Sequence, residues 1–185
     1  ASIAGQSAAA AKAGLAGAAA ADWPAMLAGF RAGLPHGVEP VAVAYADWER
    51  AAAPAPEAVV EAAGRTGFRW LLVDTWAKSG TAVVAEAAAA RLAAEWIARA
   101  HGAGMRVVLA GGLTAECLPA AVACGPDVVG VRSAACVGGR FGTVCGKRVR
   151  RLGRLCDPAA LPSAGNPAEA EREIDRGSGA PHPGA

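Results

Sequence analysis

A carboxylate and an amine stand four residues apart in the segment WLLVDTWAKSG, which covers residues 70–80. The apolar run predicts a buried strand that ends at Asp74, with Lys78 in the following turn. Polar side chains at the carboxyl ends of parallel strands are catalytic candidates, because substrates of α/β proteins bind there. In a fully extended chain the two residues would lie about 13 Å apart. An ion pair between them therefore requires a turn near residues 75–77.

Two glycine pairs follow later strand-like segments, Gly111-Gly112 after residues 106–110 and Gly138-Gly139 after residues 127–131. In α/β barrels the common phosphate site is built from the turns after the last two strands, where backbone N–H groups hold the anion. The glycine pairs therefore favour a phosphate-binding barrel over an open doubly wound sheet. The same glycines could equally serve only as tight turns between strands and helices.

Arg132, Ser133 and Asp47 are further polar residues at predicted strand ends. The guanidinium of Arg132 and the hydroxyl of Ser133 suit a phosphate, although the arginine could instead pair with a nearby aspartate. Asp47 ends the apolar run of residues 40–47. It is either a further polar group at the mouth of the site or a cap for the loop that follows.

Strand-like and helix-like segments alternate along the chain with 25 to 35 residues per unit, as they do in the repeated units of a parallel sheet. Asp22 and Pro24 mark the start of a first helix, and Thr114 can cap a later one. The remaining predicted elements are strands at 40–47, 69–75, 106–110 and 127–131, and helices at 57–65, 82–101 and 143–152.

The totals describe one ordinary globular domain: 185 residues, of which 54% are hydrophobic and 18% charged. A net charge of +2 gives no reason to expect a nucleic-acid partner, and the basic run at residues 146–155 is interpreted as a solvated helix face. The apolar stretch at residues 13–21 consists of alanine, glycine and one leucine, so no membrane span is expected. Five cysteines without zinc spacing predict no metal and a reducing cytoplasm.

Three motifs occur in order: VDT with a lysine three residues later at residues 73–78, AGGL at 110–113, and GVRSAAC at 130–136. Together they resemble the (5-formylfuran-3-yl)methyl phosphate synthases. AKAGLAG at 11–17 and AYAD at 44–47 are similar to that family's fourth and fifth strands. The resemblance implies a TIM barrel that condenses two glyceraldehyde 3-phosphates, with loss of phosphate and water. The product is the furan precursor of methanofuran-type cofactors.

Carried over residue by residue, the resemblance makes Lys12 the base that abstracts a proton and Asp74 and Lys78 the acid and base of the sixth strand. It implies phosphate contacts for Gly111, Gly112, Arg132 and Ser133, with Asp47 nearby. No cofactor is expected. Ion pairs that only hold the rim of a barrel remain the alternative for the charged residues.

The chain also departs from the family pattern. A glycine of the family becomes Ser133, and the GGDR run becomes Gly138-Gly139-Arg140 without its aspartate. No residue matches the lysine that forms the Schiff base in the family. We therefore expect an N-terminally incomplete TIM (β/α)8-type barrel, with about the last five βα units.

The predicted domain covers residues 11–156, after an unassigned segment 1–10 and before a disordered tail 157–185. A barrel lacking three units exposes two sheet edges, which favours a homo-oligomer. The expected partner is a small phosphorylated substrate. The alternatives are another phosphate-binding barrel aldolase or isomerase, or an inactive fragment of the synthase.

Overall fold

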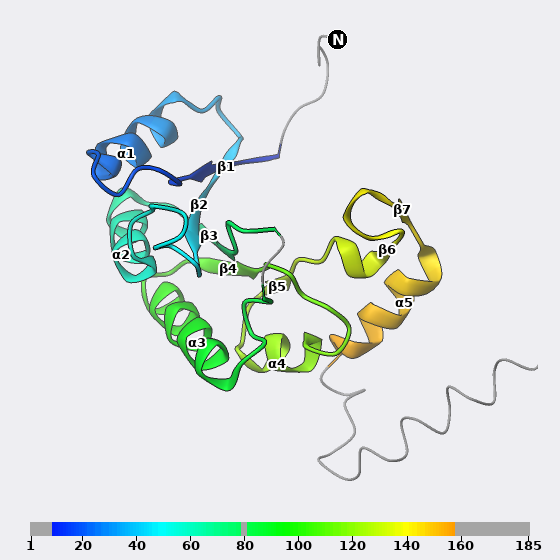
Figure 1. Ribbon diagram of the computed structural model, residues 1–185. Helices are drawn as coiled ribbons and strands as arrows, with labels where there is room; N and C mark the ends of the chain where they lie inside the picture. Colours follow the sequence, from blue (N-terminus) through cyan, green and yellow to red (C-terminus); the bar gives the residue numbers. More distant parts are fainter. Residues whose placement is uncertain (1–8, 79–80, 158–185) are drawn as a thin grey trace, which may run out of the picture.

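A parallel sheet forms the centre of the molecule (Figure 1). The computed structural model describes residues 9–78 and 81–157, and within these ranges the sheet has five strands in the order β1-β2-β3-β4-β5, each paired in parallel with the next. The strands are β1 (Ala10–Gly14), β2 (Glu39–Tyr45), β3 (Trp70–Asp74), β4 (Arg106–Leu109) and β5 (Val128–Val129). The strands expected at residues 11–17, 40–47, 69–75, 106–110 and 127–131 are thereby confirmed; each ends earlier than expected, and β1 and β2 begin one residue earlier.

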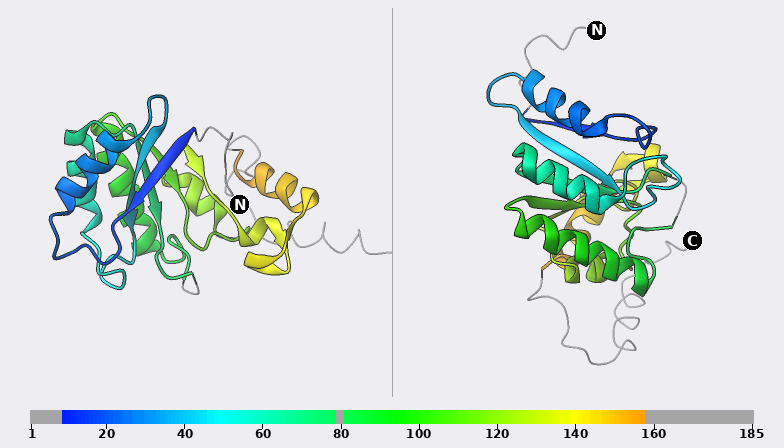
Figure 2. Two further views of the ribbon diagram at one scale, coloured as in Figure 1. Left: turned by 90° about the horizontal axis from the view of Figure 1, so that it is seen from above. Right: turned by 90° about the vertical axis from the view of Figure 1, so that its left-hand side faces the viewer.

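Helices connect successive strands and pack against one face of the sheet (Figure 2). They are α1 (Trp23–Gly33), α2 (Pro56–Thr66), α3 (Ala87–Gly102) and α4 (Leu118–Ala123). The Asp22 side chain accepts a hydrogen bond from the Ala25 N–H and caps α1, as its place before a proline-containing first turn predicts. α2 ends at Gly67, whose positive φ closes the helix in a left-handed conformation.

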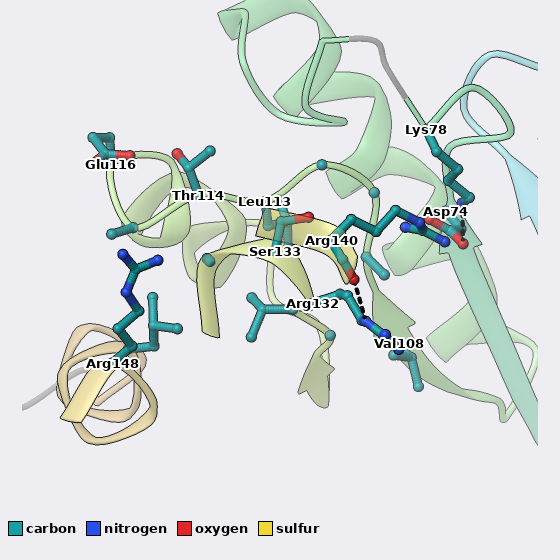
Figure 3. Close-up of a pocket in the computed structure, with 18 of the residues that line it drawn as sticks. Asp74, Lys78, Val108, Leu113, Thr114, Glu116, Arg132, Ser133, Arg140 and Arg148 are labelled. Carbon is teal, nitrogen blue, oxygen red and sulfur yellow. Dashed lines mark hydrogen bonds and ion pairs between the residues drawn. The ribbon is translucent and has the colours of Figure 1, made fainter. Parts of the chain in front are cut away.

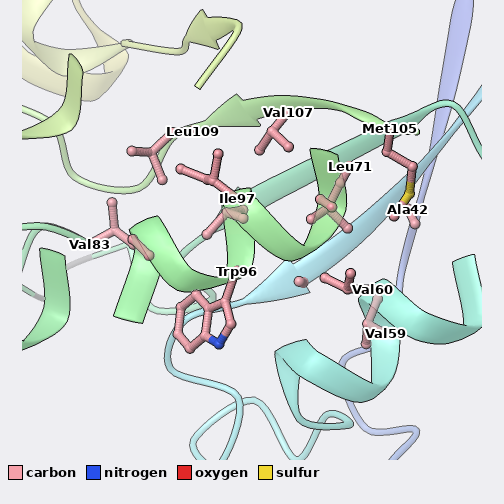
Figure 4. Close-up of a cluster of buried hydrophobic side chains, with 14 of the residues drawn as sticks. Ala42, Val59, Val60, Leu71, Val83, Trp96, Ile97, Met105, Val107 and Leu109 are labelled. Carbon is pink, nitrogen blue, oxygen red and sulfur yellow. The ribbon is translucent and has the colours of Figure 1, made fainter. Parts of the chain in front are cut away.

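The core lies between the sheet and these helices (Figure 4). Alternate strand residues point into it, among them Leu71 and Val73 of β3, and both are fully buried. Ile97 of α3 and Val59 of α2 pack in the same cluster. The intervening residues of each strand, Leu72 and Asp74 in β3, therefore lie on the opposite face.

Three helix starts differ from the prediction, and one of them, expected at residue 143, lies at Gly146 because residues 143 and 144 form a strand. α3 begins at Ala87 instead of residue 82, because the segment before it is fixed to the turn after β4: the Val83 N–H donates to the carbonyl of Gly111 at 3.0 Å. α4 begins at Leu118 with Cys117 in the capping position and no side-chain cap. The Thr114 N–H instead donates to the Cys117 sulfur at 3.1 Å, so Thr114 is not the cap.

The chain after β5 forms a small unit beside the sheet (Figure 1). It consists of two single-turn helices, η1 (Ser133–Ala135) and η2 (Gly139–Phe141), the antiparallel pair β6 (Cys136–Val137) and β7 (Thr143–Val144), and helix α5 (Gly146–Leu155). Gly142 is required at the tip, because a Cβ there would lie 1.7 Å from the carbonyl oxygen of Val137. α5 turns Leu152 into the core.

The architecture is α/β with strands added one by one in chain order, which is compatible with a barrel-like fold. Within the described ranges the sheet does not close, because β1 and β5 each have one neighbour. In those ranges no helix has both the length and the apolarity to cross a membrane, and all five cysteines are free thiols. The predicted disordered tail lies outside the described residues apart from Asp157.

Candidate active site

A cavity of about 850 Å³ opens on the sheet face opposite the helices. It extends from the carboxyl ends of the central strands to α5 (Figure 3). The residues predicted for the site that line it are Lys12, Asp74, Lys78, Gly111, Gly112, Arg132 and Ser133. Seven of the eight candidates are therefore brought together around one space.

Asp74 and Lys78 form the ion pair that the sequence allowed only with a turn between them. The Lys78 ammonium lies 2.9 Å from Oδ2 of Asp74 and also donates to the carbonyl of Thr75. The second carboxylate oxygen of Asp74 accepts the Thr75 N–H at 2.8 Å. Asp74 is largely buried, whereas Lys78 stays exposed at the rim. The Asp74 carboxylate and the Thr75 carbonyl therefore hold the Lys78 ammonium group in place at the rim of the cavity.

Lys12 lies deeper along the sheet than this pair. The strand register places Lys12 opposite Val41 and Val41 opposite Trp70, four residues before Asp74. At strand spacings of about 4.8 Å and a rise of about 3.3 Å per residue, the backbones of Lys12 and Asp74 are about 16 Å apart on a flat sheet. Both line the same cavity, but they face different parts of any bound molecule.

Asp47 does not line the cavity. Its carboxylate accepts the N–H groups of Trp76 at 2.6 Å and Ala77 at 2.9 Å, so it holds the turn that carries Lys78. Partial burial acts to raise the pKa of Asp47, but these N–H groups outweigh it and the pKa lies below its usual value. The sequence analysis offered a place at the mouth of the site or a cap for the loop after Asp47; the structure instead shows the side chain holding the turn after β3.

The glycine pair after β4 forms a tight turn against the neighbouring strand end. Gly111 and Gly112 both have positive φ, 107° and 64°. A Cβ on Gly111 would lie 2.8 Å from the backbone nitrogen of Thr75, and one on Gly112 would lie 3.1 Å from Cα of Ala82. Only glycine brings this turn so close to β3, and the turn thereby forms the floor between Asp74 and the arginines.

Arg132 and Arg140 face each other across the part of the cavity next to this turn (Figure 3). Nε of Arg132 donates to the backbone carbonyl of Arg140 at 3.1 Å, which links the loop after β5 to η2. The side chain of Arg140 extends toward Asp74 and Lys78 (Figure 3). Among the described residues no carboxylate pairs with either guanidinium, so both can receive an anion.

Four charged lining residues escaped the sequence analysis as site residues: Arg140, Arg148, Arg151 and Glu116. The run at residues 146–155 was interpreted as a solvated helix face, but two of its arginines face the cavity. A hydrogen bond from the Thr114 side chain keeps the pKa of the Glu116 carboxyl below its usual value. The signal that could have found the arginines is their spacing of three residues, which places both on one side of a helix.

The lining is strongly cationic, with six basic side chains and two acidic ones. A lysine and a lysine–carboxylate pair can move protons on a carbonyl compound, and the arginines and the glycine turn can hold phosphate groups. The fold and the site thus define an α/β protein suited to acid–base chemistry on a phosphorylated small molecule.

Comparison with known proteins identifies the family. The model of the 4-HFC-P synthase family matches residues 1–153, so the chain belongs to this family. The (5-formylfuran-3-yl)methyl phosphate synthase of Methanocaldococcus jannaschii is 35% identical over 118 residues, covering 63% of this chain and 50% of that protein. The synthase of Methanobrevibacter smithii is 34% identical over 119 residues, with 63% and 50% covered. The chain therefore spans about half the length of the curated relatives it matches.

A search of solved structures gave a weaker likeness. Phosphoribosyl anthranilate isomerase from Thermus thermophilus aligns with a TM-score of 0.35 and 20% sequence identity, over 71% of this chain and 78% of that one.

Proposed function

We propose that this chain is part of a (5-formylfuran-3-yl)methyl phosphate synthase and supplies acid–base and phosphate-binding groups for a reaction of two molecules of glyceraldehyde 3-phosphate. The observation that supports this most is the convergence of Lys12, the Asp74–Lys78 pair and the glycine turn on one cationic cavity. The reaction joins two phosphorylated aldehydes and releases one phosphate and water, so it requires acid–base groups and anchors for two dianions.

The cavity offers different groups to the two substrates. The backbones of Lys12 and Asp74 lie about 16 Å apart on a flat sheet, so the two side chains enter the cavity at different places. In our proposal Lys12 removes a carbon-bound proton from one triose, and the Asp74–Lys78 pair assists the departure of hydroxide as water from the other. Arg132, Arg140 and the glycine turn hold a phosphate between them.

The same proposal includes a TIM barrel as the fold of the complete enzyme, with the five strands described here as five consecutive units. The parallel strands in chain order and the helices on one face of the sheet support this. We further propose a carbon–oxygen lyase with an iminium intermediate, located in the cytoplasm, where five free thiols are stable. A homo-oligomer is proposed as well, since β1 and β5 are sheet edges in the described part of the chain.

The test is incubation with glyceraldehyde 3-phosphate, followed by furan absorbance and phosphate release. Borohydride is added in a parallel reaction to trap an imine. The chain is assayed by itself and together with the N-terminal half of the Methanocaldococcus jannaschii relative as a separate polypeptide. Furan formation in either arm that is lost in Lys78→Ala supports the proposal. Absence of furan in both arms would refute it.

A further inference from the structure

Tyr45 is the last residue of β2, between the strand of Lys12 and the strand of Asp74. The register pairs it with Asp74. Paired residues of parallel strands point to the same side, so the tyrosine ring lies on the face that carries both Lys12 and Asp74. It is the single tyrosine of the sequence.

The ring is directed across β1. A Cβ built on Gly14 would lie 2.4 Å from the Tyr45 hydroxyl oxygen, which places this hydroxyl over the glycine. Gly14 follows Lys12 by two residues on the same face, so the hydroxyl lies about 7 Å along the strand from the lysine. Gly14 therefore provides the space for the hydroxyl on the strand that carries Lys12.

The ring is held in place, and Tyr45 is half-buried beside the residues that line the cavity rather than among them. Trp76 packs against the ring edge to face, with centroids 5.8 Å apart. Burial, followed by the charges of Asp74 and Asp47, raises the pKa of the phenol above 10.0, so it remains protonated. Among the described residues no hydrogen-bond partner of the hydroxyl is found. A fixed phenol with a free O–H can donate to an oxygen atom of a ligand.

We propose that Tyr45 is a further catalytic residue, whose hydroxyl donates a hydrogen bond to the carbonyl oxygen of the triose phosphate from which Lys12 takes a proton. The C–H bond breaks, the proton passes to the Lys12 amine, and the electron pair enters the new carbon–carbon double bond as negative charge develops on the oxygen. The Tyr45 O–H stabilises that charge without giving up its own proton. This inference rests on the proposed function.

The first test is Tyr45→Phe, which keeps the ring and its contact with Trp76 but removes the donor. We expect kcat to fall about 10²-fold, with KM for glyceraldehyde 3-phosphate and the melting temperature unchanged. Wild-type turnover in Tyr45→Phe, while the unaltered chain makes furan, would overturn the inference and leave the proposed function intact.

The second test uses Gly14→Ala to displace the hydroxyl without removing it. The added methyl group should lower kcat in the chain with Tyr45. In the Tyr45→Phe background Gly14→Ala should change kcat little, because the new methyl carbon would lie 3.5 Å from the nearest ring carbon. Equal effects of Gly14→Ala in both backgrounds would contradict the placement of the hydroxyl.

A third measurement does not depend on furan formation. Ultraviolet difference spectra are recorded on adding glyceraldehyde 3-phosphate to wild type and to Tyr45→Phe, and subtracting one from the other isolates the single tyrosine from the five tryptophans. A perturbed tyrosine band without any furan product would support the contact with substrate and refute the proposed reaction. An unperturbed band at saturating ligand would overturn the inference.

Discussion

Replacing Asp47 with alanine removes both acceptors that hold the turn between β3 and Lys78. The wild-type carboxylate accepts two N–H groups, at 2.6 Å from Trp76 and 2.9 Å from Ala77. A hydrogen bond to a charged group contributes about 1.5–3 kcal/mol when buried. Because these bonds are partly exposed to water, we expect a total loss of about 1–3 kcal/mol in the free energy of unfolding.

The larger effect should be on turnover. Without Asp47 the turn no longer fixes the ammonium group of Lys78 beside Asp74, and a displacement of about 1 Å can cost about 10²-fold in rate. Amide hydrogen exchange at Trp76 and Ala77 should accelerate in Asp47→Ala, while kcat for furan formation falls at least about tenfold. Asp47→Asn retains one acceptor oxygen, so its exchange rates and its kcat should lie between those of wild type and Asp47→Ala.

The pH dependence of unfolding tests whether the lost stability comes from the Asp47 carboxylate. The folded pKa of Asp47 is depressed below 3.8, so its contribution to stability is present above that value and disappears as the pH falls through the folded pKa. The difference in the free energy of unfolding between wild type and Asp47→Ala should therefore vanish in strong acid. Glu49→Gln, an exposed change of equal charge two residues away, is the control. Identical exchange rates and kcat in Asp47→Ala and wild type would refute the reasoning.

Three further predictions follow from other residues. Arg140→Gln should raise KM for glyceraldehyde 3-phosphate in steady-state assays, whereas Arg150→Gln, with the same charge change on an exposed residue outside the cavity lining, should not. Gly111→Ala should lower the melting temperature and kcat together, since its methyl group meets the Thr75 backbone. Asp127→Ala should destabilise the chain by about 1–2 kcal/mol in urea titrations, because the carboxylate accepts the Val107 N–H at 2.7 Å. This difference should fade in acid, because the hydrogen bond from Val107 depresses the pKa of Asp127 and its contribution is lost as the pH falls through that value.

Strands β2 to β5 could be predicted because each is a short apolar run with valine or leucine residues, a local property, whereas β1, with the sequence AAKAG, was anticipated only from the family resemblance. The ion pair of Asp74 and Lys78 could also be anticipated, since a single turn brings the two together. Helix starts were less predictable: the segment before Ala87 has helix-forming residues, but its hydrogen bond to Gly111, far along the chain, keeps it out of the helix.

The depth of Lys12 and the places of Tyr45 and Arg148 could not be read from the sequence. Each depends on the register between strands or on how α5 packs, and these are set by contacts between residues far apart in the chain. Asp47 shows the same limit: its position at a strand end predicted a place in the site, whereas its partners are two amides 29 and 30 residues away.

The central claim is that Lys12 and Lys78 face one phosphate-binding cavity. The sequence contains three lysines, and the third, Lys147, is exposed on α5 outside the cavity lining. The most direct measurement is amine acetylation with and without glycerol 3-phosphate, quantified for each lysine by mass spectrometry. The account predicts that the ligand protects Lys12 and Lys78 and leaves Lys147 unchanged. Equal labelling of all three lysines with saturating ligand would contradict it.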